Sequence, residues 1–181
     1  MATESKPIEM NTLLPDFSVL ATDGHTYSAK SFERAKVLVV GFTCNHCPYV
    51  QAYEQRLVQL VKDFASRGVD FLCINSNDDK AYPDDSFEKM KERYKSQSFN
   101  FIYARDESQN IAKVFNAACT PEFYVYDESR RLQYHGRLDD NHKDPAQVKV
   151  TFLRNAIEDL LSKRQVQTAQ TAALGCSIKW K

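Results

Sequence analysis

The pattern of apolar and polar positions predicts a central strand that leads directly into an amphipathic helix. Residues 37–42 are all apolar or glycine and rich in β-branched side chains, which is typical of a strand buried on both faces. Further along, apolar residues recur at steps of three and four from Val50 to Phe64, as on one face of a helix, until Arg67-Gly68 ends the pattern. We therefore expect residues 43–48 to connect a buried strand to a helix N-terminus.

Further strands and helices are predicted before and after this strand and helix. Asp23-Gly24 lies between two short strand-like segments and predicts a hairpin. Capping residues predict three later helices, opened by residues 84–86, by Asp106 with Gln109, and by Asp144-Pro145. The other strands are expected at residues 17–20, 26–28, 69–75, 101–103, 122–127 and 131–135. Because a helix precedes it, the strand at 69–75 should run parallel to the central one.

The length of the chain predicts one domain. A chain of 181 residues can bury a hydrophobic core without disulfide bonds to hold it together. We expect a flexible lead-in at residues 1–11, an α/β domain at residues 12–162, and a C-terminal tail at residues 163–181 that packs on this domain.

Charge and hydropathy argue against two classes of partner. The 24 basic and 24 acidic side chains balance and form no basic stripe, so a nucleic acid is not expected. No segment approaches the roughly 18 apolar residues that cross a membrane, and the first residues lack the apolar core of a signal peptide. The odd number of cysteines, five, favours a reducing compartment. We expect a cytoplasmic protein.

Two cysteines, Cys44 and Cys47, occupy the predicted strand-to-helix junction. Unpaired N–H groups and the helix dipole stabilise a thiolate there, and the thiolate is the nucleophile of disulfide exchange. We predict that Cys44 is the outer, attacking thiol and that Cys47 resolves the mixed disulfide. His46, if protonated, should lower the pKa of Cys44 and destabilise the disulfide.

Two other roles for these cysteines are open. They could form half of a structural zinc site, but zinc takes about four ligands and the sequence offers no second close pair of cysteines or histidines. They could also be inert core residues, although the strand, C-x-x-C and helix arrangement is the one that redox chemistry requires. We expect a redox-active pair with neither a metal nor a cofactor.

The order of the expected elements resembles the thioredoxin fold, an α/β fold with a mixed central sheet flanked by helices. The hairpin before the central strand is similar to the N-terminal extension of the redoxin superfamily. Four motifs together resemble the peroxiredoxin-like group with a C-x-x-C motif: residues 42–50, residues 119–121, residues 136–140 and residues 175–180. The match spans residues 12–181, and such a set of spaced motifs is more specific than a lone C-x-x-C.

This resemblance implies a substrate-binding element. Pro121 would be the cis-proline that faces the active-site cysteines. The backbone N–H and C=O of Thr120 would then pair with an extended substrate segment and hold its disulfide at the site. The buried acid of thioredoxin is missing from residues 37–43, and Glu122 or Asp139 could replace it.

The resemblance to peroxiredoxins is incomplete. Around Cys47, which would align with the peroxidatic cysteine, Val40 and Cys44 replace the expected proline and threonine. The arginine expected before the later strand is absent from residues 118–121. Because those polar groups polarise the O–O bond, their replacement weakens the case for efficient peroxidase chemistry.

The sequence therefore predicts a thiol–disulfide oxidoreductase that acts on a protein or low-molecular-weight disulfide and is reduced by an upstream thiol reductant. One alternative is a weak thiol peroxidase with an antioxidant role, in which Cys47 is peroxidatic. Another is a metal or cluster binder that uses Cys44, Cys47 and His46, with Cys119 as an optional further ligand. A redox-inert binding module is the least consistent with the C-x-x-C motif.

The C-terminal segment carries one more cysteine, Cys176, between Gly175 and the apolar residues Ile178 and Trp180. It could be an incidental tail thiol. However, apolar residues in a tail usually cover a surface, so we expect the tail to pack through Trp180. Cys176 would then be an auxiliary resolving thiol for the C-x-x-C pair or for Cys119, provided that the Cα atoms approach within about 7 Å.

Overall fold

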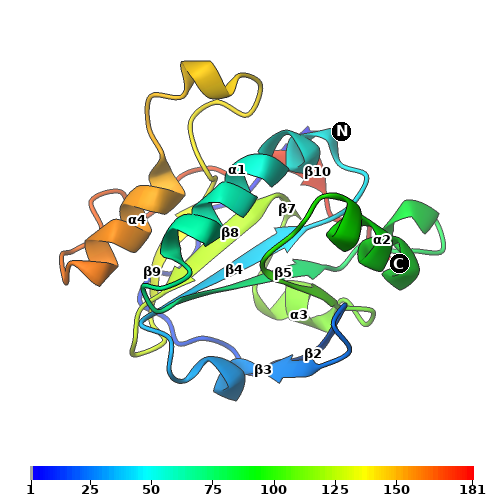
Figure 1. Ribbon diagram of the computed structural model, residues 1–181, viewed down its shortest axis with the longest axis horizontal. Coiled ribbons are helices and arrows are strands. Elements are labelled where there is room, and N and C mark those ends of the chain that lie inside the picture. Colours follow the sequence, from blue (N-terminus) through cyan, green and yellow to red (C-terminus); the bar gives the residue numbers. More distant parts are fainter. Residues whose placement is uncertain (1) are drawn as a thin grey trace.

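The computed structural model describes residues 2–181 and contains a mixed sheet of seven strands (Figure 1). Across the sheet, the strands are β3 (Thr26–Ser28), β2 (Ser18–Ala21), β6 (Ile102–Arg105), β5 (Val69–Asn75), β4 (Val37–Thr43), β8 (Glu122–Tyr126) and β9 (Leu132–Gly136). β4 pairs in parallel with β5 and antiparallel with β8. All seven residues of β4 are buried, which confirms the predicted central strand.

Helices cover both faces of the sheet. They are α1 (Pro48–Phe64), α2 (Phe87–Ser96), α3 (Asn110–Val114) and α4 (Phe152–Leu161), and short 3-10 turns occur at η1 (Ala29–Phe32), η2 (Pro83–Asp85) and η3 (Pro145–Gln147). One core cluster joins α1, α2 and α4 to one face of the sheet, and a second joins α3 and η1 to the other face. This is a thioredoxin-like α/β fold, and the hairpin β2–β3, which pairs with β6 through β2, is its N-terminal extension.

Two helices begin later than the capping residues suggest. The carboxylate of Asp144 accepts an N–H bond at 2.9 Å from Ala146, but this caps only η3. The chain then stays extended because Lys149 and Val150 bond to Asp140, and α4 starts at Phe152. Similarly, Asp106 does not open α3.

The start of α3 is set by the backbone. Gln109 has a left-handed φ of 63°, which a continuous right-handed helix does not allow. The Asp106 carboxylate instead accepts the N–H of Ala112, at 3.0 Å. The helix therefore begins only at Asn110.

The two ends of the described chain form a second, smaller sheet with the segment before Pro121. Its strands, in order, are β1 (Ala2–Glu4), β10 (Leu174–Ser177) and β7 (Cys119–Thr120), and all neighbours are antiparallel. The N–H of Ser5 also bonds to the carbonyl of Ala173, at 2.9 Å. The flexible lead-in predicted for residues 1–11 is therefore wrong for residues 2–5, because strand pairing with the tail holds them in place.

The C-terminal tail packs on the domain, but through a different residue from the predicted one. Ile178 is only 3% exposed and joins the core cluster that contains α3. Trp180 is 44% exposed, so the prediction that it anchors the tail is wrong. Pairing of β10 with both neighbours fixes the backbone, and the alternation along a strand turns Ile178 inward.

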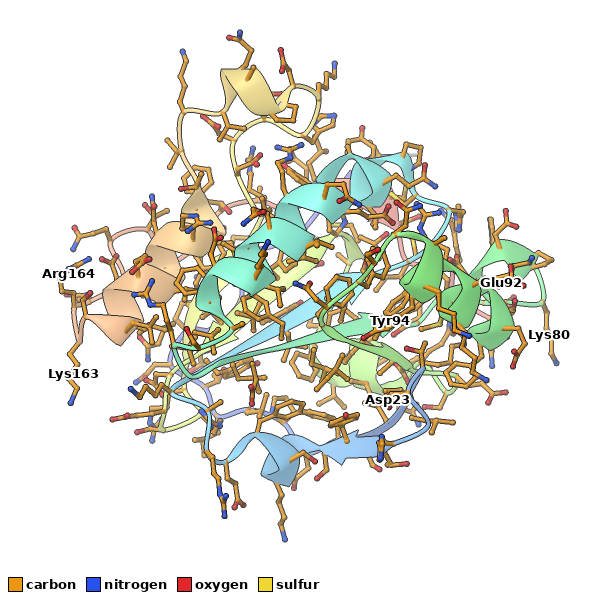
Figure 2. The ribbon with its side chains drawn as sticks, viewed as in Figure 1. Asp23, Lys80, Glu92, Tyr94, Lys163 and Arg164 are labelled. Carbon is orange, nitrogen blue, oxygen red and sulfur yellow. The ribbon has the colours of Figure 1, made fainter. Side chains whose placement is uncertain are left out.

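Lys80 and Lys163 are among the charged side chains on the outside of this core. Figure 2 shows Lys80 and Lys163 extending outward at opposite ends of the molecule. Among the helices within residues 2–181, none combines the length and the apolar character needed to cross a membrane.

Candidate active site

The C-x-x-C segment connects β4 to α1, as predicted. Cys47 is the N-cap of α1, and Pro48 is the first helical residue, a position where its missing N–H costs nothing. Cys44 lies one residue after β4. The exposed fractions of the two cysteines are 2% for Cys44 and 0% for Cys47. Both thiols are therefore buried in the reduced protein, and the prediction that Cys44 is the outer, attacking thiol remains a prediction.

The segment before Pro121 packs directly on these thiols. The peptide bond between Thr120 and Pro121 is cis, which confirms the predicted isomer. The hydroxyl of Thr120 lies 3.3 Å from the Sγ atom of Cys44. In its protonated form, the Cys47 thiol donates to the carbonyl oxygen of Thr120, also at 3.3 Å. One residue thus contacts both cysteines of the pair.

The two thiols differ in acidity, in the opposite sense to the prediction. The Cys44 thiol, as a donor to the Cys47 sulfur, lowers the pKa of Cys47 to about 5, and the Cys176 thiol adds to this effect, although burial opposes it. Burial raises the pKa of Cys44 well above its ordinary value, and Cys47 and the carboxylate of Asp85 raise it further. The reduced pair therefore carries its negative charge on Cys47, at the helix N-terminus, where an anion is most stable.

That His46 lowers the pKa of Cys44 remains a prediction, and the structure places its ring against Asp85 and Tyr82. Its Nδ1 atom lies 2.5 Å from the carboxylate of Asp85, and its ring stacks on Tyr82 with centroids 5.1 Å apart. The imidazole is therefore engaged by a carboxylate whose own charge raises the pKa of Cys44.

Asp85 is the site residue that sequence reasoning missed. It is completely buried at the end of η2, and its carboxylate accepts bonds from the backbone N–H of Asn45 at 2.6 Å and from the amides of Asn75 and Asn77 at 3.2 and 2.8 Å. In the sequence, Asp85 resembles an ordinary helix-opening acid. The signal that could have identified its role is the pair of polar residues, Asn75 and Asn77, at the carboxyl end of a buried parallel strand, where α/β sheets place their sites.

Three potential metal ligands meet at this point, since donor atoms of Cys44, His46 and Asp85 lie within 4.8 Å of one another. However, the carboxylate of Asp85 already accepts from three other groups besides His46. A metal would have to replace several of these buried bonds, so the donor set does not fit a resident ion.

The other candidate residues form a separate cluster. Cys119 is completely buried, and its thiol contacts the carboxylate of Glu122 at 3.7 Å and the carbonyl of Ala173 at 3.6 Å. Burial raises the pKa of Cys119. Glu122 binds His135 at 2.7 Å.

Asp139, the other proposed replacement for the buried acid, pairs with Arg56 at 2.5 Å. Asp85, rather than Glu122 or Asp139, is thus the buried carboxylate that faces Cys44.

A polar cleft of about 440 Å³ opens beside the C-x-x-C segment. Asn45, His46 and Gln51 line one side of it. The opposite side includes Glu92 of α2, which is labelled at the edge of the molecule in Figure 2. Solvent therefore reaches the imidazole of His46, whose side chain is 23% exposed.

Cys176 completes the site from the C-terminal strand. In the pairing of β10 with β7, it lies opposite Thr120, and it packs against the cluster formed by Cys44, Cys47 and Val50. Burial, together with the adjacent Cys47, raises the pKa of Cys176 to about 11. The strand position next to Thr120, which the resemblance assigns to a substrate, is occupied here by the chain itself.

The fold and the paired cysteines next to a cis-proline define a thioredoxin-like protein of the redoxin type. The Redoxin family matches residues 9–151, and the chain belongs to this family. A search of curated proteins gave no match.

Two of the solved structures that the chain resembles cover nearly its whole length. A conserved protein from Geobacillus kaustophilus is 38% identical, with a TM-score of 0.94, over 100% of this chain and 97% of that chain. A hypothetical protein from Sinorhizobium meliloti 1021 is 36% identical, with a TM-score of 0.92, over 99% and 98%. A thiol:disulfide interchange protein from Chlorobium tepidum TLS shares the fold at 20% identity, with a TM-score of 0.66, over 86% of this chain and 99% of that chain.

Proposed function

We propose that this protein is a thiol–disulfide oxidoreductase in which Cys44 and Cys47 form the redox-active pair. The observation that carries the proposal is the contact between the two thiols, with the pKa of Cys47 lowered to about 5. A thiolate at neutral pH is the reactive form in disulfide exchange. The substrate is a protein or low-molecular-weight disulfide, and an upstream thiol reductant regenerates the pair in a reducing compartment such as the cytoplasm.

In this mechanism, the Cys47 thiolate attacks one sulfur of the substrate disulfide. A mixed disulfide forms, and the other substrate sulfur leaves as a thiolate that takes up a proton. Cys44, in contact with Cys47, then attacks the Cys47 sulfur and releases the second substrate thiol. This order reverses the roles predicted from the sequence, because the charge of the reduced pair lies on Cys47 rather than on Cys44.

Two neighbouring groups support this chemistry. The pair of His46 and Asp85 sets the charge next to Cys44, and the polar cleft at His46 offers a path for a substrate. Thr120 contacts both thiols. Its backbone pairs with β10, so an extended substrate segment would have to displace β10 to pair there.

The test is reduction of an insulin disulfide by the full chain with dithiothreitol as the electron donor. We expect Cys47→Ser to abolish activity. Cys44→Ser combined with Cys176→Ser removes both thiols that pack next to Cys47, so this variant should lose turnover and accumulate a mixed disulfide on Cys47, detectable by intact mass. Trapping on Cys44 in Cys47→Ser, with no adduct in Cys44→Ser combined with Cys176→Ser, would reverse the assignment, and activity in Cys44→Ser combined with Cys47→Ser would overturn the proposal.

A weak thiol peroxidase is the second candidate, and the acidity and helix N-cap position of Cys47 favour it. The thiolate would attack a peroxide to give a sulfenic acid and an alcohol or water, and Cys44 would then form the disulfide and release water. Peroxide consumption with dithiothreitol measures this activity. A rate constant that matches free cysteine would remove this candidate while leaving disulfide reduction untouched.

A further inference from the structure

We infer that Cys176 is a third redox-active thiol, which exchanges with the disulfide of the C-x-x-C pair through the sulfur of Cys47. This inference rests on the proposed function, because it needs a disulfide between Cys44 and Cys47 to act on. It adds a catalytic residue from the C-terminal strand and gives the tail a role in the chemistry.

The first observation is the position of Cys176 in the smaller sheet. β10 runs antiparallel to β7, with Cys176 opposite Thr120 and Ser177 opposite Cys119. The N–H of Ile178 continues this pairing with the carbonyl of Ala118, at 3.2 Å. Thr120 is also the residue that contacts both active-site thiols. The strand pairing therefore delivers Cys176 to the site.

The second observation is the closeness of this pairing. At Gly175, a side chain would collide with the carbonyl group of Thr120 and would reach the ring nitrogen of Pro121. Glycine lets the two backbones approach at this point. The residue before Cys176 thus allows the tail to lie directly on the segment that precedes the cis-proline.

The third observation is that the tail is fixed on both sides of Cys176. Before it, the carbonyl of Ala173 accepts the N–H of Ser5. After it, the N–H of Lys179 bonds to the side chain of Asn77 at 2.8 Å, and the carbonyl of Lys179 accepts the amide of Gln109 at 2.8 Å. Asn77 is also bonded to Asp85. The same polar network therefore holds the tail and the active-site carboxylate.

The fourth observation concerns the sulfur atoms themselves. Cys176 packs against the small cluster of Cys44, Cys47 and Val50, and this closeness helps to lower the pKa of Cys47. Cys44, Cys47 and Cys176 are therefore neighbours in one small cluster. The other two cysteines have different surroundings, since Cys73 is in β5 and Cys119 faces Glu122.

The exchange step is a balanced isomerisation. The Cys176 thiol loses its proton, its sulfur attacks the sulfur of Cys47, and the bond between Cys44 and Cys47 breaks. Cys44 leaves as a thiolate and takes up a proton, so that the disulfide now joins Cys47 to Cys176. No electrons enter or leave, and the oxidant is the one that made the first disulfide.

This step has a consequence for substrates. When the disulfide joins Cys47 to Cys176, β10 is covalently linked to the N-cap of α1 and stays paired with β7, so the Thr120 edge is closed to an extended segment from another protein. When the disulfide joins Cys44 to Cys47, the Cys176 thiol is free and β10 is held only by non-covalent contacts. The third thiol would thus decide whether a small disulfide or a protein segment can reach Cys47.

The experiment is disulfide mapping of the full chain. The wild type, Cys44→Ser, Cys176→Ser and Cys73→Ala proteins are equilibrated with glutathione and glutathione disulfide, quenched in acid, alkylated and analysed by peptide mass spectrometry. We expect the wild type to be a mixture of molecules in which Cys47 is linked to Cys44 and molecules in which it is linked to Cys176. Cys44→Ser should form the Cys47 to Cys176 disulfide, and Cys176→Ser should contain only the one between Cys44 and Cys47.

Alkylation of Cys44 provides a second measurement that does not depend on Cys44→Ser being folded. In oxidised wild type, the alkylated fraction of Cys44 should equal the fraction of Cys47 linked to Cys176, and it should fall to background in Cys176→Ser. Cys73→Ala, a buried cysteine outside the cluster, should leave the distribution of disulfides unchanged.

The outcomes separate the hypothesis that Cys176 is a redox-active thiol from the proposed oxidoreductase function. If Cys44 and Cys47 form their disulfide while Cys176 stays reduced in the wild type, and Cys47 is glutathionylated in folded Cys44→Ser, the third thiol is ruled out and the proposed function stands. If Cys44 and Cys47 form no disulfide in Cys176→Ser and this variant does not reduce insulin, the proposed function itself fails.

Discussion

Two histidine–carboxylate pairs in this protein differ mainly in their access to solvent. His46 and Asp85 are joined across 2.5 Å, and the side chain of His46 is 23% exposed while that of Asp85 is fully buried. His135 and Glu122 are joined across 2.7 Å, and both side chains are 1% exposed. The same chemical pair therefore occurs once at a cleft and once in the core.

The two carboxylates, Asp85 and Glu122, also accept hydrogen bonds from different parts of the chain. Asp85 connects the C-x-x-C segment to the ends of β5 through Asn45, Asn75 and Asn77. Glu122 accepts the backbone N–H groups of Ala118 and Cys119 at 2.8 and 3.1 Å and so fixes the segment before the cis-proline. The comparison teaches that the surroundings, more than the residue types, decide which pair can act on the thiols and which one holds the structure.

The largest expected effect is the loss of the core pair. Glu122→Gln should lower the free energy of unfolding by about 3–5 kcal/mol, because it leaves buried groups without their charged partner. Urea denaturation measures this loss. The matched control, Glu158→Gln, breaks a partly exposed pair with Arg67 and should cost about 0–1 kcal/mol. A similar small loss in both variants would show that the core pair has no structural role.

Acid denaturation should also show the contribution of Glu122 to stability. Burial raises the pKa of Glu122, but bonds from His135 and from the backbone outweigh burial, so that the pKa lies below its ordinary value of 4.5. A group whose pKa is lower in the folded state stabilises the protein above its unfolded pKa and loses this contribution as the pH falls through its folded pKa. Stability of the wild type should therefore decline below pH 4.5, and this decline should be shallower in Glu122→Gln.

The pair at the cleft should act on the thiols instead. In Asp85→Asn, the negative charge that raises the pKa of Cys44 is removed, so the pKa of Cys44 should fall. Alkylation of reduced Cys44 at neutral pH should become several-fold faster. Asp84→Asn, at the exposed neighbouring position, should leave this rate unchanged. An unaltered rate in Asp85→Asn would mean that its charge does not reach the pair.

The smallest expected effect is that of His46→Ala. Removal of the imidazole leaves the Asp85 charge uncompensated next to the thiolate, which should lower the reduction potential of the disulfide slightly. For the wild type, we expect a potential above the value of about −270 mV known for thioredoxin, because a stabilised thiolate favours the reduced form. Equilibration with glutathione measures both potentials. His25→Ala, in the hairpin, is the control, and a rise in potential in His46→Ala would contradict this role.

The sequence by itself determined the local frame of the site. The apolar run of β4, the C-x-x-C segment and the periodicity of α1 each depend on neighbours within a few residues, and they place Cys44 and Cys47 at the junction seen in the structure. The order of the elements also sufficed for the fold, because short connections leave few possible arrangements. The cis bond before Pro121 followed from its motif.

Only the tertiary structure decided which groups surround the thiols. Asp85 reaches His46 because η2 folds over the end of β5, and Cys176 reaches Cys47 because β10 pairs with β7 in one register. A strand register is fixed by contacts across the whole sheet, and a shift of one residue would turn Cys176 to the other face. Burial and charge make Cys47, rather than Cys44, the thiolate of the reduced pair. Both arise from these long-range contacts and leave no periodic signal in the sequence.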